Sequence, residues 1–134
     1  MKEKIDEESK KALVAYRIER AYETLKEADV MRREAFYNAA VNRLYYACYY
    51  AAVSLLLKYG IQAQTHSGVK TMLGLHFFST GKLRVRIGKI FSTLFEKRHS
   101  GDYDDFIYCD KDMVDDLYAQ AKEFVDTIKE NIYQ

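Results

Sequence analysis

The sequence predicts an all-α protein, an up-and-down helical bundle of four long helices and one short helix. The chain of 134 residues has no proline and only 6 glycines, so few residues would interrupt a helix. Hydrophobic residues make up 49% of the sequence, and they recur at the three- and four-residue spacings of helices. A chain of this length suits a single domain over residues 1–134.

The central helix is expected over residues 35–57, where Arg43 is the sole charged residue. Its apolar positions form a very wide face, so other helices should cover it on most sides. A membrane span does not fit, because Arg43, two asparagines and several tyrosines interrupt the apolar run. An unpaired buried charge is costly. We therefore expect Arg43 to be buried and paired with a carboxylate, with Asp102 as the expected partner.

Four more helices are expected around the central one. They cover residues 6–33, a short stretch from about 67 to a stop at 79–81, residues 82–99, and a last segment that begins after Asp110, a good N-cap residue. The apolar stripe of the fourth helix continues onto Arg98 in its last turn. There a cation also suits the helix dipole.

Charge is balanced overall, with a net charge of +1, but it is unevenly distributed. Lysines and arginines dominate the fourth helix, and aspartates dominate residues 102–116. One interpretation is a solvated helix face followed by an acidic cap. The other is a cationic strip that receives phosphates, or an acidic edge that meets a basic partner.

Common catalytic and metal-binding motifs do not occur in the sequence. There is no glycine-rich phosphate loop, no GxSxG, no HExxH and no CxxC, and Cys48 and Cys109 are too far apart to indicate a disulfide framework. We therefore expect no cofactor and no metal site. The charged N-terminus does not look like a signal peptide, so we expect a cytoplasmic protein that does not contact membranes.

Three short segments together resemble a known family. The central helix carries Arg43, Tyr45, Tyr46 and Ala47; the following loop carries Thr65, His66 and Gly68; and the end of the fourth helix carries Arg98, Asp102 and Tyr103. In this order on a helical chain, they resemble the HEPN family (higher eukaryotes and prokaryotes nucleotide-binding domain), in its branch of small stand-alone prokaryotic proteins.

The resemblance implies a bundle that dimerises around its motif, and an excess of tyrosines on the central helix also favours a homodimer. In many members it further implies metal-independent RNA cleavage, by a toxin paired with a minimal nucleotidyltransferase antitoxin. The catalytic candidates are Arg98, Tyr103 and His66. The candidates for binding or supporting a nucleotide or phosphate are Arg43, Asp102, His99 and Tyr46.

The sequence departs from the family pattern at one catalytic position. The family places a histidine four to six residues beyond the motif arginine, but Tyr103 and two aspartates stand five to seven residues after Arg98. A tyrosine, with a reference pKa near 10, is a poor base at neutral pH. We therefore expect a nucleotide- or RNA-phosphate-binding module, the HEPN component of a toxin–antitoxin pair. The alternative is a metal-independent endoribonuclease that uses Arg98 with a histidine outside the motif.

Overall fold

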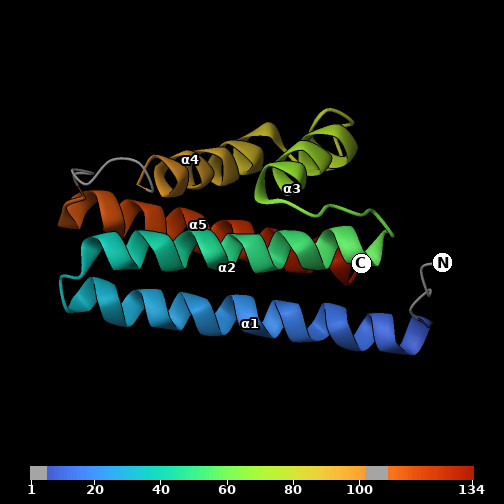
Figure 1. The fold of residues 1–134 in the computed structure, drawn as a ribbon, viewed down its shortest axis with the longest axis horizontal. Coiled ribbons are helices and arrows are strands. Elements are labelled where there is room, and N and C mark those ends of the chain that lie inside the picture. Colours follow the sequence, from blue (N-terminus) through green and yellow to red (C-terminus); the bar gives the residue numbers. More distant parts are fainter. Residues whose placement is uncertain (1–5, 102–108) are drawn as a thin grey trace.

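The computed structural model describes residues 6–101 and 109–134, with the backbone alone for residues 99–101. In chain order the elements are α1 (Glu7–Arg33), α2 (Tyr37–Lys58), α3 (His66–Leu73), a π-helical segment η1 (Gly74–Phe78), α4 (Val85–Gly101) and α5 (Lys111–Ile132). The long helices alternate in direction along the chain (Figure 1). The all-α, up-and-down bundle predicted from the sequence is confirmed.

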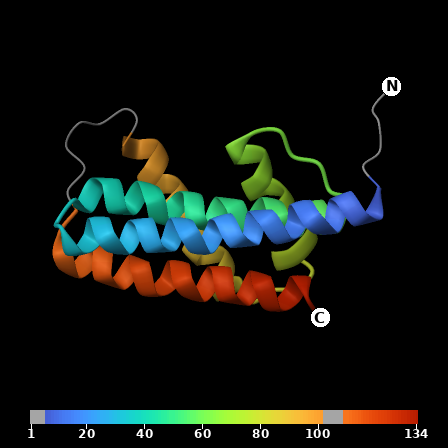
Figure 2. The same cartoon turned by 90° about the horizontal axis from the view of Figure 1, so that it is seen from below.

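The second helix, α2, is the centre of the bundle. It contacts α1, α3, α4 and α5, and small residues such as Ala40, Ala47 and Ala51 are completely buried along it. Figures 1 and 2 show α1 on one side of α2, with α3 and α4 on the opposite side and α5 alongside. The almost uncharged sequence of α2 follows from this position, because neighbouring helices replace water around most of its surface.

A tight turn joins α1 to α2. Ala35 lies in it with a φ of 63°, in the left-handed region, and the amide of Phe36 donates to the carbonyl of Met31 at 2.8 Å. The central helix therefore begins at Tyr37, two residues later than predicted. At the other end of α2, Gly60 has a φ of 69° and its amide donates to the carbonyl of Leu57. This is the glycine stop that the sequence predicts.

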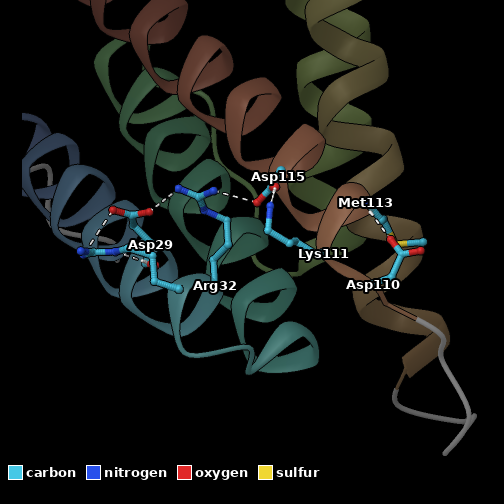
Figure 3. Close-up of polar contacts among 7 residues, drawn as sticks. Asp29, Arg32, Asp110, Lys111, Met113 and Asp115 are labelled. Atoms are coloured by element: carbon cyan, nitrogen blue, oxygen red, sulfur yellow. Dashed lines mark hydrogen bonds and ion pairs between the residues drawn. The ribbon is translucent and has the colours of Figure 1, made fainter.

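An ion-pair network fastens the end of α1 to the beginning of α5 (Figure 3). The Arg32 guanidinium donates to Asp29 at 2.6 Å and to Asp115 at 2.7 Å, and Lys111 also donates to Asp115 at 2.8 Å. The carboxylate of Asp110 caps α5 by accepting from the Met113 amide at 2.8 Å. The N-cap predicted at Asp110 is confirmed, and Asp110 and Asp115 both have structural roles.

The fourth helix begins at Val85, three residues later than predicted. Leu83 nevertheless lies in the core, and its amide donates to the carbonyl of Phe77 at 2.9 Å. Within residues 6–101 and 109–134, no helix has the length and apolar character needed to cross a membrane.

Candidate functional site

Three tyrosines of α2 and one histidine of α3 form an aromatic cluster. Tyr45 is fully buried, and its hydroxyl shares a 2.7 Å hydrogen bond with Nδ1 of His66. The ring of His66 stacks on Tyr49, with centroids 4.3 Å apart and planes 12° apart. Tyr46 meets the edge of the same imidazole at 5.8 Å. His66 is therefore held by three rings of the central helix.

Local sequence explains how His66 reaches this position. Thr65 is the N-cap of α3, and its hydroxyl accepts from the amide of Gly68 at 2.9 Å. A Cβ at Gly68 would lie only 2.9 Å from that hydroxyl oxygen, so glycine permits the close approach. His66 is consequently the first residue of α3, at the end of the helix that lies beside α2. The Thr-His-x-Gly pattern is thus a capping motif that fixes an imidazole.

Arg98 reaches the cluster from the end of α4. It is half-buried, its Nη2 donates to the Tyr46 hydroxyl at 3.3 Å, and its guanidinium carbon lies 5.6 Å from the ring centroid. The guanidinium carbon of Arg43 lies 5.1 Å from the same centroid. Two arginines from different helices therefore converge on one tyrosine, and each gains from the cation–π attraction of the ring.

The environment of Arg43 corrects one prediction. Its side chain is 27% exposed, and its carboxylate partner is Glu27 of α1, at 3.6 Å. The prediction that Arg43 is buried is therefore wrong. The residue lies at the edge of the face that α2 turns towards α1, where it also donates to Asn42 at 3.1 Å and remains accessible to water. Pairing with Asp102 lies outside the described residues.

Tyr45 and Tyr49 keep their protons at neutral pH. Burial raises the pKa of Tyr45 well above its usual range, and the positive charge of Arg98 opposes that rise only in part. Burial also raises the pKa of Tyr49, while Arg17 acts in the opposite direction. Neither phenol is therefore a base near pH 7. Both can act as hydrogen-bond donors.

The structure brings together four of the residues predicted for the site. Arg98, Arg43 and His66 all lie against Tyr46. Asp102 and Tyr103 lie outside the described residues, and so does the side chain of His99. Sequence reasoning did not assign the roles of Tyr45 and Tyr49 around His66. The available signal was their spacing, because residues three and four apart share one side of a helix.

Other charged and metal-binding candidates have simpler roles. Arg86 of the basic fourth helix pairs with Glu123 of α5, so this part of the predicted cationic strip is engaged within the bundle. In the part of the chain that the structure describes, no group of three or more histidine, cysteine or acidic side chains could hold a metal ion. Cys48 is buried, and burial raises the pKa of its thiol. It therefore remains a protonated core residue.

Comparison with known proteins finds relatives that match most of this chain. A family model described as the HEPN domain matches residues 14–132. A UPF0332 protein of Thermotoga maritima is 34% identical over 123 residues, which span 92% of this chain and 93% of the relative. A protein of Methanocaldococcus jannaschii, named as a putative toxin, is 33% identical over 112 residues, or 84% of this chain and 83% of the relative.

The fold has also been seen before. The crystal structure of an archaeal HEPN homologue superposes with a TM-score of 0.72 at 20% sequence identity, covering 89% of this chain and 97% of that one. At this identity the likeness concerns the fold. The superposition covers most of both chains, as the family match over residues 14–132 does.

Proposed function

The chain belongs to the HEPN domain family, and we propose that it is a nucleotide- or RNA-phosphate-binding module, the HEPN component of a toxin–antitoxin pair with a minimal nucleotidyltransferase. One observation carries the binding proposal. The guanidinium groups of Arg98 and Arg43, from two helices, lie against the ring of Tyr46. A planar guanidinium with several donors matches the oxygens of a phosphate.

The surroundings of the two arginines suit an exchangeable anion. Arg43 is held by Glu27 across 3.6 Å, and the two side chains are 27% and 45% exposed. Partly exposed ion pairs of this kind contribute little to stability. A phosphate can therefore compete with Glu27 for Arg43 while Arg98 and the Tyr46 hydroxyl supply further donors.

His66 fits a binding role at this site. Because Tyr45 keeps its proton, its hydroxyl can donate to Nδ1 of His66. A neutral imidazole that accepts at Nδ1 carries its own hydrogen at Nε2. In that state Nε2 donates a hydrogen bond and cannot take a proton. His66 therefore adds a donor group to the same tyrosine ring, Tyr46, that the two arginines contact.

The toxin–antitoxin setting is supported by the relatives in Methanocaldococcus jannaschii, which are named as putative toxins. Its test is genetic. Induced expression of this chain should stop the growth of a bacterial host, and co-expression of a minimal nucleotidyltransferase from an adjacent reading frame should restore growth. Normal growth during verified expression of soluble protein would argue against a toxin.

The binding proposal is tested with a fluorescent single-stranded RNA by anisotropy. Arg98→Gln should weaken binding by about ten- to a hundred-fold, because a hydrogen bond to a charged group contributes roughly 1.5–3 kcal/mol. Arg84→Gln is the matched control, since Arg84 is an exposed cation just before α4. Equal losses of affinity in the two variants would show that RNA binds to the positive charge of the protein as a whole, and that the arginines at Tyr46 do not form a specific site.

An endoribonuclease is the second candidate, because His66 and Arg98 both contact Tyr46. In this reaction the 2′-hydroxyl gives up its proton as its oxygen attacks phosphorus, and the bond from phosphorus to the 5′-oxygen breaks. The 5′-oxygen leaves with a proton, and a cyclic phosphate remains. Wild-type protein should then cut RNA in EDTA, while His66→Ala and Arg98→Gln should not. RNA that stays intact over hours, although it binds through Arg98, would leave the binding module as the function.

A further inference from the structure

We infer that a cleft beside the arginine site receives an unpaired nucleobase of the nucleotide or RNA whose phosphate lies at Arg98 and Arg43. The inference rests on the proposed function. The cleft has a volume of about 450 Å³ and lies between α1, α2 and the segment that leads to α3. Its lining includes Arg17, Tyr49, Tyr50, Val53, Gln62 and Gln64.

The cleft neighbours the arginine site, because aromatic rings of α2 contact one another between the two. Tyr49, which lines the cleft, lies 6.2 Å from Tyr46, and Tyr46 contacts Arg98. Tyr50 lies 6.2 Å from both Tyr46 and Tyr49, measured between ring centroids. A strand with a phosphate at Tyr46 can therefore reach the cleft, because only Tyr49 or Tyr50 lies between them. Aromatic rings along a basic path are typical of proteins that bind single-stranded nucleic acids.

Two arginines of α1 lie along the same path, and one of them, Arg20, is paired with Glu23 at 3.0 Å. The guanidinium carbon of Arg20 lies 5.4 Å from the ring centroid of Tyr50. Arg17 lines the cleft and is half-buried, and no carboxylate of the described residues lies within ion-pair distance of it. A cation in this position is suited to a second phosphate of the same strand.

The chemistry of the lining favours a nucleobase over a purely apolar ligand. Val53 and the neighbouring leucines form an apolar wall of the cleft. Gln62 and Gln64, in the segment that leads to α3, add polar groups to its lining. A carboxamide offers both donors and an acceptor, as the edge of a base does. An aliphatic ligand would offer no polar atom to Gln64 or to Arg17. A base matches the apolar wall with its faces and the polar groups with its edge.

The test compares two fluorescent single-stranded RNA tetramers, one with four bases and one with the same sugar-phosphate backbone but no bases. Wild type should bind the tetramer with bases roughly 5- to 100-fold more tightly, as expected when one base stacks in a pocket. Val53→Phe should fill the cleft and abolish this difference while leaving affinity for the abasic tetramer unchanged. Val30→Phe, at an exposed valine of α1 outside the cleft, should keep the difference.

A second variant guards against a folding defect in Val53→Phe. Gln64 is exposed, so Gln64→Ala should preserve the fold and reduce the preference for the tetramer with bases. If wild type binds both tetramers equally, and Arg98→Gln weakens both, the base site is refuted and the phosphate site stands. If neither tetramer binds to wild type, the proposed function fails and the base site with it.

Discussion

Removing the Tyr45 hydroxyl tests whether the buried tyrosine holds the site in place. Tyr45→Phe keeps the ring, which packs 5.9 Å from Phe91, and removes the 2.7 Å hydrogen bond to His66. A hydrogen bond contributes roughly 0.5–1.5 kcal/mol net, and the imidazole nitrogen left behind in a half-buried position adds to the loss. We expect a total loss of about 1–2 kcal/mol in the free energy of unfolding.

The assay is chemical denaturation followed by circular dichroism, with Tyr49→Phe as the matched control. Among the described residues the Tyr49 hydroxyl has no hydrogen-bond partner, so its removal should change stability by less than about 0.5 kcal/mol. Equal midpoints for Tyr45→Phe and Tyr49→Phe would refute the reasoning, because they would show that the bond to His66 does not contribute to the folded state.

Three further predictions concern the fold and assembly. Ala35→Gly should raise stability by up to about 1 kcal/mol in the same denaturation assay, since a non-glycine residue at a φ of 63° is strained; a loss would contradict the turn geometry. The hydrogen bond from Lys111, and next in size the one from Arg32, hold the pKa of the Asp115 carboxyl below its usual range. The ionised Asp115 therefore stabilises the fold fully above the usual pKa of an aspartate, near 4, and this stabilisation is lost as pH falls through the lower pKa of the folded protein. The melting temperature of Asp115→Asn should consequently fall less in acid than that of wild type. Sedimentation equilibrium should give twice the 15.7 kDa of one chain, because we propose a homodimer; the mass of a single chain at high micromolar concentration would rule it out.

The fold was predictable because its determinants are local and periodic. The lack of proline allows long helices, the wide apolar face predicts that α2 is central, and Asp110 marks the start of α5. Each of these features can be read from residues close together in the sequence. Helix starts were less accurate. Alanine favours helix, yet Ala35 takes the left-handed conformation of a turn, because the two packed helices require the chain to reverse there.

The site was only partly predictable because its contacts join distant segments. The resemblance pointed to Arg98, His66 and Tyr46, but no spacing along the chain shows that Tyr45 bonds to a histidine 21 residues later. Burial of Arg43 was inferred from the apolar sequence around it. That inference failed because a helix edge can carry a charge to water even when its neighbours are buried.

The salt dependence of RNA binding tests the phosphate site most directly. The slope of log K against log salt concentration counts the phosphate charges that the protein neutralises. Arg98→Gln should reduce this slope by about 0.7 for a single strand. It should weaken binding of all sequences to a similar extent, as expected for a lost phosphate contact. Arg98→Lys, which keeps the charge but not the planar fork, should keep the slope and still lose affinity. An unchanged slope and unchanged affinity in Arg98→Gln would contradict the claim that Arg98 holds a phosphate.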